Sequence, residues 1–314
     1  MDSLLRIFPQ KRRAFWQKTA DNGEKICEIR LRVDRPVIVE TSRGDYFLNN
    51  GGEWQEHPYG AHLVTEAEIR ELIAWLCQDS VYAYADEIRQ GFLTVEGGHR
   101  IGLCGQAVLE NETVIRTLKN IAFINIRVAH EIRGAADGIL PKLYKKGKFQ
   151  NTLIVSPPGF GKTTLLRDLI RQISDGNTYG AGLRVGVVDE RSELAGSYLG
   201  RPQNDLGMRT DVLDACPKAE GMMMLIRSMA PEVVAVDEIG GENDLEALRY
   251  VMNCGCRILA TVHGNSMEDI REKPGLSSFL QEKRFERYVV LGNRRGPGTV
   301  EAVYDAAGEE LICG

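Results

Sequence analysis

The sequence is poor in the features that mark membrane-spanning, secreted and nucleic-acid-binding proteins. Across its 314 residues no apolar run approaches the roughly 20 residues that a transmembrane helix needs, and the N-terminus lacks the apolar core of a signal peptide. The 39 lysines and arginines are outnumbered by 44 aspartates and glutamates, so the bulk positive charge of a nucleic-acid binder is missing. We therefore expect a cytoplasmic protein that reaches a membrane, if at all, through its partners.

Cysteine pairing is equally sparse. The seven cysteines are an odd number and mostly scattered, and Cys254 and Cys256 form a close pair without the second pair that a zinc site needs. This usage indicates the reducing cytoplasm. A hydrophobic fraction of 43% over this length is enough for two domains with cores of their own.

The first 132 residues predict a small α+β domain. Residues 1–25 have helical spacing, and residues 28–33 alternate charged and apolar side chains as a half-buried strand does. Thr65 and Glu68 form a capping box ahead of an amphipathic helical pattern, and residues 92–103 predict a hairpin. We expect residues 133–150 to be a linker and residues 151–314 to form a second domain.

A phosphate-binding loop begins the second domain. The apolar run 153–155 is followed by a Pro/Gly turn and then by a leucine-rich helical pattern that opens at Lys162. Strand, loop and helix in this order direct backbone N–H groups at an anion, with Lys162 reaching the phosphates and the Thr163 hydroxyl ligating Mg²⁺. Ser156 stands where the usual motif has its first glycine. The residues expected to contact nucleotide are Pro158, Gly159, Phe160, Gly161, Lys162, Thr163 and Thr164.

Four short apolar runs predict a doubly wound parallel sheet. They lie at residues 153–155, 185–188, 233–236 and 258–260, with helical patterns between them, and continuous apolarity is typical of strands buried on both faces. Toward the C-terminus, residues 285–291 and 299–304 predict a hairpin around a turn that contains Arg294 and Arg295, after a break at Pro274.

Polar residues follow each of the four strands, and in such sheets ligands bind at the carboxyl ends. Asp237 fits the Walker B role of holding Mg²⁺, and Glu238 is the candidate for activating the attacking water. Asp189 and Glu190 form a second acidic pair that can position metal or water, or can simply be helix-capping charges. His263 can sense the γ-phosphate through a hydrogen bond, although a histidine at a strand end is often structural.

These segments resemble the secretion and pilus ATPases. The resemblance lies in residues 227–240 and 260–266, with Asp189-Glu190 as an acidic box and His263 as a histidine box, and residues 28–36 are similar to a strand of their second N-terminal domain. Residues 211–222, 237–240 and 293–301 resemble, more narrowly, the stage III sporulation protein AA family of endospore-forming bacteria. Asp237-Glu238 replaces the Gly-Glu of many secretion motors, and a four-cysteine zinc module is missing from the sequence.

The resemblance implies a RecA-like P-loop domain that binds ATP and Mg²⁺ and works as a ring, with six subunits expected. It implies ATP hydrolysis that powers or assembles the channel between mother cell and forespore, with membrane channel proteins as partners. Such sites need positive charge on the γ-phosphate, often from another domain or subunit, and Arg100 and Arg116 are the first candidates. Arg127 and Arg209 are less favoured alternatives.

Two other functions remain open on the sequence alone. One is a nucleotide-binding scaffold that docks membrane partners with little turnover, which the set of Lys162, Asp237 and Glu238 disfavours. The other is a RecA-like motor on DNA, which the acidic balance and the lack of an aromatic and basic groove disfavour.

Overall fold

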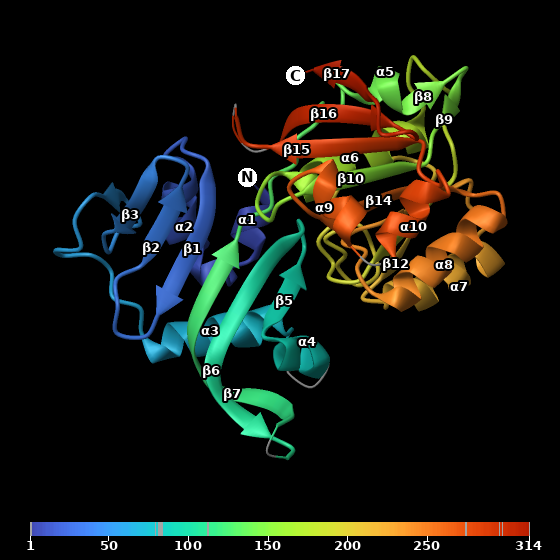
Figure 1. The fold of residues 1–314 in the computed structure, drawn as a ribbon. Coiled ribbons are helices and arrows are strands. Elements are labelled where there is room, and N and C mark those ends of the chain that lie inside the picture. Colours follow the sequence, from blue (N-terminus) through green and yellow to red (C-terminus); the bar gives the residue numbers. More distant parts are fainter. Residues whose placement is uncertain are drawn as a thin grey trace. The chain divides into compact units, whose positions relative to one another are not determined.

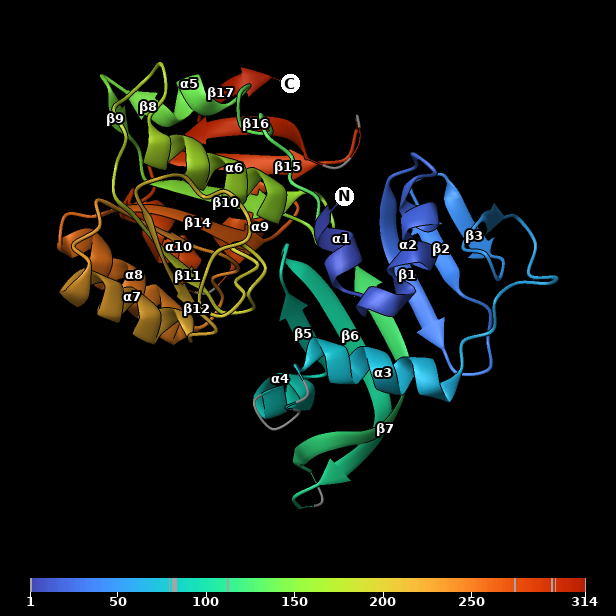
Figure 2. The same cartoon turned by 180° about the vertical axis from the view of Figure 1, so that it is seen from behind.

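The computed structural model describes residues 2–78, 80, 84–111, 113–273, 275–294, 296 and 298–313 (Figures 1 and 2). The chain divides into two compact units. Unit 1 contains residues 1–130 and 196–203, and unit 2 contains residues 131–195 and 204–314. No described helix combines the length and apolarity that crossing a membrane requires.

Unit 1 is an antiparallel sheet covered by helices. Within the described residues the sheet has seven strands in the order β4-β3-β2-β1-β7-β6-β5. The strands are β1 (Ile26–Arg32), β2 (Ile38–Thr41), β3 (Gly44–Leu48), β4 (Trp54–Gln55), β5 (Phe92–Val95), β6 (His99–Leu109) and β7 (Ile115–Arg127). The helices are α1 (Asp2–Arg6), η1 (Gln10–Arg12), α2 (Arg13–Ala20), α3 (Glu66–Leu76) and α4 (Ala85–Gln90). The predicted hairpin is β5-β6, and β3 and β4 were not predicted.

Helix α3 begins where the capping box predicts. The Thr65 hydroxyl accepts from the backbone N–H of Glu68 at 3.2 Å, and the Glu68 carboxylate accepts from the Thr65 N–H at 2.8 Å. The apolar stripe Ile69, Leu72 and Leu76 is buried in the unit's core. The capping pair and the stripe agree, so this helix was predictable from local sequence.

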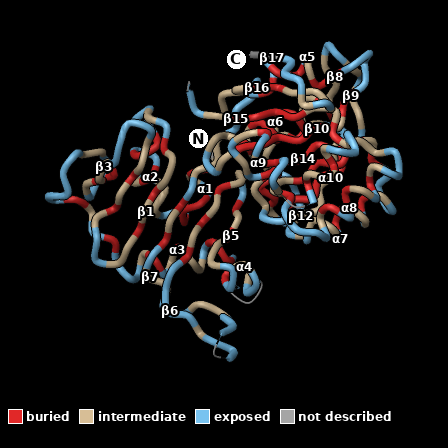
Figure 3. Tube along the Cα trace, viewed as in Figure 1, coloured by how far each residue is buried: buried red, intermediate tan, exposed pale blue. Residues whose placement is uncertain are grey.

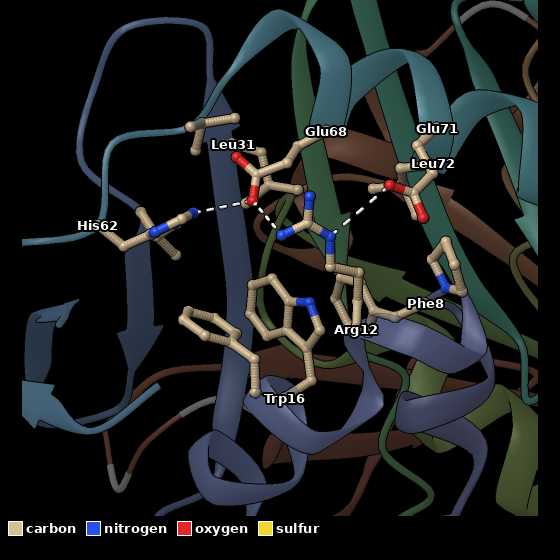
Figure 4. Close-up of a pocket in the computed structure, with 12 residues that line it drawn as sticks. Phe8, Arg12, Trp16, Leu31, His62, Glu68, Glu71 and Leu72 are labelled. Atoms are coloured by element: carbon tan, nitrogen blue, oxygen red, sulfur yellow. Dashed lines mark hydrogen bonds and ion pairs between the residues drawn. The ribbon is translucent and has the colours of Figure 1, made fainter. Parts of the chain in front are cut away.

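The capping glutamate also ties α3 to the N-terminal helices, as Figure 4 shows. Glu68 Oε1 lies 2.9 Å from Arg12 Nη1 and 2.9 Å from His62 Nε2. Beneath them the rings of Phe8 and Trp16 stack with centroids 4.0 Å apart and line a pocket of about 50 Å³. Burial would raise the pKa of Glu68, but the Thr65 N–H and His62 lower it below its ordinary value. The pocket therefore lies at the edge of the unit 1 core, beside the cluster of Glu68, Arg12 and His62.

Unit 2 is a three-layer α/β/α domain, which confirms the predicted fold class. The described sheet has eight strands in the order β12-β11-β13-β14-β10-β15-β16-β17. These are β10 (Thr152–Ser156), β11 (Val185–Asp189), β12 (Thr210–Asp214), β13 (Val233–Val236), β14 (Arg257–His263), β15 (Arg287–Gly292), β16 (Thr299–Asp305) and β17 (Glu310–Cys313). The first six in the order are parallel, and the last two form an antiparallel edge. The predicted C-terminal hairpin is β15-β16, which continues the main sheet. Arg295 and Pro297 of its turn, and Pro274, lie outside the described residues.

Helices cover both faces of this sheet, and its central strands β10, β11, β13 and β14 are largely buried (Figure 3). One face packs against α6 (Lys162–Asp175), whose leucines and isoleucines are buried as predicted. The other packs against α7 (Lys218–Ser228), α8 (Glu242–Asn253), α9 (Met267–Glu272) and α10 (Leu276–Gln281). Met222 and Leu225 of α7 are buried, whereas Met229, which follows the end of the helix at Ser228, is 43% exposed.

The segment 133–150, expected as a linker, carries structure that belongs to unit 2. It forms α5 (Leu140–Leu143) and a small hairpin of β8 (Tyr144–Lys145) with β9 (Lys148–Phe149). Leu140, Leu143 and Phe149 are buried in the core that α6 shares with the sheet. The basic residues between them mark a hairpin turn, so their charge reflects exposure and not a flexible connection.

Unit 1 contains a buried histidine, His99, at the start of β6. His99 is 2% exposed, its Nδ1 accepts from the Ala129 N–H at 3.1 Å, and its Nε2 lies 3.1 Å from the Ser3 hydroxyl. The Nδ1 contact requires a neutral ring, because a protonated Nδ1 would meet another donor. Burial, with help from nearby His130, lowers the pKa of His99 to about 4.

We expect acid to destabilise unit 1 through His99. Its pKa falls from an ordinary 6.5 to about 4 on folding, so the unfolded chain binds the proton more tightly. The stabilisation is complete above pH 6.5 and is lost as the pH falls toward 4, by up to about 3 kcal/mol. The measurement is urea unfolding by tryptophan fluorescence at pH 7 and pH 5, because the tryptophans Trp16, Trp54 and Trp75 all lie in unit 1.

His99→Asn is the matched control, because it keeps an acceptor near the position of Nδ1 and removes the titration. The variant should lose less stability between the two pH values than the unaltered protein does. His130, whose pKa burial also lowers, is present in both proteins, so the difference between them reports His99 together with its interaction with His130. Equal losses in the two proteins would show that His99 does not carry the effect.

Candidate active site

The phosphate loop lies between β10 and α6, as the sequence predicts. Gly159 and Gly161 have φ values of +78° and +80°, a region that other residues rarely adopt. Gly161 precedes the first turn of α6, whose leading N–H groups have no partner within the helix. Pro158 and Gly159 are exposed, and Thr164 is half-buried in that first turn. The loop therefore presents backbone donors and a helix N-terminus outward, which is the arrangement that binds anions.

Ser156 fits the motif position at which glycine is usual. Its side chain is buried, and its hydroxyl donates to the Pro157 carbonyl at 2.9 Å. On β14 its register partner is His263, so the loop starts beside the histidine box. The departure from glycine leaves the loop intact and adds a bond that glycine cannot make.

Lys162 is a buried ammonium surrounded by carboxylates. The residue is 5% exposed, and its Nζ lies 2.8 Å from Glu238 Oε1 and 3.6 Å from Asp237 Oδ1. A buried ammonium needs such anionic partners, because losing its hydration costs several kcal/mol. The predicted loop lysine and the predicted pair after β13 are thus in direct contact.

Asp237 is oriented by two threonines. Thr163 Oγ1 lies 3.3 Å from Asp237 Oδ2, and the Thr261 hydroxyl donates to Oδ1. Thr261 also accepts from the Glu238 backbone N–H at 2.8 Å and is fully buried. No role for Thr261 was predicted from the sequence. Its signal is a polar residue inside an otherwise apolar strand, two positions before the histidine.

Glu238 contacts two cations and a histidine. Oε1 lies 2.8 Å from Lys162 and 3.1 Å from His263 Nε2, and Oε2 lies 3.0 Å from Arg191 Nη1. Burial alone would raise the pKa of Glu238, but the hydrogen bond and charge of Lys162, with His263 and Arg191, lower it. Its φ of +54° is strained for a non-glycine residue, and such strain is common at functional sites.

Asp189 organises the loop that follows β11. Its carboxylate accepts from the backbone N–H groups of Glu193, Leu194 and Ala195 at 2.8 to 3.0 Å. Burial nevertheless raises the pKa of Asp189 to about 6 against these bonds. Arg167 of α6 holds the same loop by donating to two of its carbonyls at 2.8 Å. With both oxygens occupied, Asp189 is placed to shape the loop, and its expected contact with metal stays a prediction.

Glu190 is exposed and pairs with Lys218 at the start of α7. Both line a hollow of about 20 Å³ that Asp237, Glu238 and Arg191 also line. A space of this size holds one water molecule. The two acidic pairs predicted to follow separate strands therefore share one small cavity.

The two arginines that were the first candidates, Arg100 and Arg116, lie in unit 1. The Arg100 guanidinium, on β6, is centred 3.8 Å from the Phe92 ring centroid, and Arg116 is exposed near the start of β7.

At the phosphate-binding loop, the Phe160 carbonyl accepts a hydrogen bond from the backbone N–H of Gly298, in the β15-β16 turn, at 2.8 Å. That contact brings the C-terminal hairpin to the phosphate loop, which the sequence did not predict.

The donor set fits Mg²⁺ chemically. Asp237 offers a carboxylate and Thr163 a hydroxyl beside it, and both are the hard oxygen ligands that this ion prefers. The partners that remain for other ligands in such sites are water and phosphate oxygens. The arrangement can bind a phosphorylated ligand, place a divalent ion on it, and hold a carboxylate beside a water-sized space.

Comparison with known proteins identifies the family to which this chain is similar. The family model described as Sporulation stage III, protein AA matches residues 1–311. The chain is 40% identical over 312 residues to Stage III sporulation protein AA of Bacillus subtilis (strain 168), covering 99% of this chain and 97% of that protein.

Solved structures agree on the fold. The pilus retraction motor PilT with bound ADP is similar with a TM-score of 0.58 at 14% identity, covering 95% of this chain and 82% of that chain. The ATPase DotB of Legionella pneumophila is similar with a TM-score of 0.56 at 13% identity, covering 89% and 75%. These matches extend over an N-terminal domain and a RecA-like core. The chain belongs to the stage III sporulation protein AA family.

Proposed function

We propose that this protein is an ATP hydrolase of the secretion-ATPase type whose turnover powers or assembles the channel between mother cell and forespore. The convergence of Lys162, Thr163, Asp237 and Glu238 at one edge of the sheet carries the proposal. The fold shared with the motor PilT, whose structure contains ADP, supports a nucleotide as ligand. Membership of a sporulation family supports the setting.

The phosphates of ATP bind at the loop. The N–H groups of the loop and of the first turn of α6 donate to phosphate oxygens, and Lys162 supplies the charge. Thr163 and Asp237 would hold Mg²⁺, which when bound neutralises charge on the β- and γ-phosphate oxygens. Asp189 would support this site through the loop that its carboxylate organises.

Glu238 orients and deprotonates the attacking water. The neighbouring cations lower its pKa, so the carboxylate is ionised at neutral pH and can accept a proton. The same carboxylate holds Lys162 at 2.8 Å, so an arriving phosphate competes with Glu238 for the ammonium. His263 contacts the same oxygen and would report the γ-phosphate, and Glu190 lines the water-sized cavity.

Assembly would complete the enzyme. The proposed organisation is an N-terminal domain over residues 1–132 and a P-loop domain over 151–314, joined by the segment 133–150, which packs in the core of the P-loop domain. We propose a ring, with six subunits, in which Arg100 and Arg116 approach the nucleotide of the same or a neighbouring subunit. The ring would act from the cytoplasm on membrane proteins of the sporulation channel.

Glu238→Gln should abolish turnover, by about 10²-fold or more, and tighten ATP binding. The amide keeps the shape of the side chain but cannot take the proton, and it no longer competes as an anion for Lys162. Lys162→Ala should lose nucleotide binding altogether. The measurements are phosphate release and ATP affinity by calorimetry, with Glu286→Gln, a glutamate paired with Arg257, as the control.

Three outcomes would contradict this assignment. Normal turnover in Glu238→Gln would remove the base. Tight ATP binding without turnover in the unaltered protein would favour a scaffold that docks membrane partners. ATPase activity that DNA stimulates in a salt-sensitive way, and that channel peptides do not stimulate, would favour a DNA motor.

Thr261→Val should lower kcat about tenfold or more while Thr261→Ser retains most activity. Valine keeps the volume but removes the hydroxyl that orients Asp237 and the Glu238 backbone. Because Asp237 faces Mg²⁺, the valine variant should also need more Mg²⁺ for half-maximal activity. A loss shared equally by valine and serine would point to packing and not to the hydroxyl.

Turnover should rise with assembly. Mass measured by light scattering and ATPase rate, taken together across protein concentration with and without ATP, should increase in parallel. Arg100→Ala or Arg116→Ala should lower the specific activity of the assembled form without preventing assembly. A rate per subunit that stays constant from monomer to assembly would show that the site needs nothing from a neighbour.

A further inference from the structure

We propose that Arg191 is a catalytic residue that supplies positive charge to the γ-phosphoryl group from within unit 2. The inference rests on the proposed ATPase activity and adds a residue that the sequence analysis did not select. Arg191 Nη1 lies 3.0 Å from Glu238 Oε2, and the other oxygen of that carboxylate contacts Lys162. One carboxylate group therefore separates the Arg191 guanidinium from the phosphate-binding ammonium.

The head of Arg191 is free to change partner. Its side chain is 62% exposed, and Glu238 is its only ion-pair partner among the described residues. A surface ion pair of this kind contributes little to stability, so the contact with Glu238 explains little of the fold. A dianionic phosphate is a stronger partner for a guanidinium than one carboxylate.

The backbone that carries Arg191 is held rigidly. On its C-terminal side, Ser192 has a strained φ of +52° and its hydroxyl donates to Asp214 at 2.7 Å. Beyond it, Asp189 binds three consecutive amides, and Arg167 of the phosphate-loop helix binds two carbonyls. The backbone that carries Arg191 is thus tied by hydrogen bonds to helix α6, which begins at the phosphate-binding loop. A backbone held in this way keeps the guanidinium within reach of the site, and positioned donors are what transition-state stabilisation needs.

The charge on the γ-phosphoryl group during hydrolysis is what the Arg191 guanidinium would stabilise. In hydrolysis the water oxygen bonds to the γ-phosphorus, and the bond to the bridging oxygen breaks with its electron pair leaving on ADP. The proton of the water passes to Glu238, and the charge of the transferring group is spread over its phosphoryl oxygens. A guanidinium that reaches those oxygens stabilises this charge more in the transition state than in the ground state.

The experiment compares Arg191→Ala with Arg184→Ala in the full-length protein. The two arginines flank the same strand, β11, and are 62% and 59% exposed, each beside one glutamate. Arg184 lies at the amino end of the strand, away from the nucleotide edge, so its variant should keep its activity. Arg191→Ala should lose about 10²-fold in kcat with ADP affinity changed less than threefold, and Arg191→Lys should recover part of the loss.

A second readout separates direct action from action through Glu238. Affinity for ADP with aluminium fluoride, which imitates the transferred phosphoryl group, should fall at least tenfold more than ADP affinity in Arg191→Ala. The same difference should persist when Glu238 is also alanine. If it disappears there, Arg191 only positions Glu238 and the proposal is overturned.

The remaining outcomes are also decisive. Full activity in Arg191→Ala, with losses in Arg100→Ala or Arg116→Ala, would overturn the proposal and leave the ATPase assignment standing. Absence of nucleotide binding in the unaltered protein would instead overturn the ATPase assignment, and this inference with it. Thermal unfolding of each variant, matched to the unaltered protein, excludes misfolding as the cause of a loss.

Discussion

The site depends on the contact between one buried ammonium and two carboxylates. Lys162 is taken out of water by the start of α6 and must be paired, and Glu238 and Asp237 pair it. An ammonium held this way is ready for a phosphate, because the phosphate replaces one anion by another and no new desolvation is needed. The cost of burying Lys162 is thereby offset both with and without a ligand. Under the proposed mechanism a bound phosphate would displace Glu238 from Lys162, which would link nucleotide binding to release of the proposed base.

The groups around this contact hold its geometry. Thr261 bonds both the Asp237 side chain and the Glu238 backbone, and Asp189 gathers the loop that ends beside them. Strained backbone at Glu238 and Ser192 persists because these bonds compensate for it. Precision here comes from buried hydrogen bonds on strands and helices, while the exposed side chains of Arg191 and His263 remain able to respond to a ligand.

Much of the fold was predictable because its signals are local. These signals are the capping box of α3, the leucine-rich face of α6 and the apolar runs of β10, β11, β13 and β14. The residues that make up each signal lie close together in the sequence. β3, β4 and β12 were not predicted, because short or half-exposed strands lack a strong pattern. The segment 133–150 was expected as a linker because its lysines suggested an exposed connection, yet Leu140, Leu143 and Phe149 within it are buried.

The sequence by itself determined the phosphate loop, the acidic pairs and the edge of the sheet at which they meet, because strand ends and glycine turns are written in adjacent residues. Only the tertiary structure decided how those residues divide the work. β14 comes last of the four predicted strands along the chain, yet it lies between β10 and β13, and this order puts Thr261 beside Asp237. The structure also shows that Asp189 accepts hydrogen bonds from backbone amides, whereas Arg191 contacts Glu238. Contacts between strands distant in sequence depend on sheet order, which no local pattern encodes.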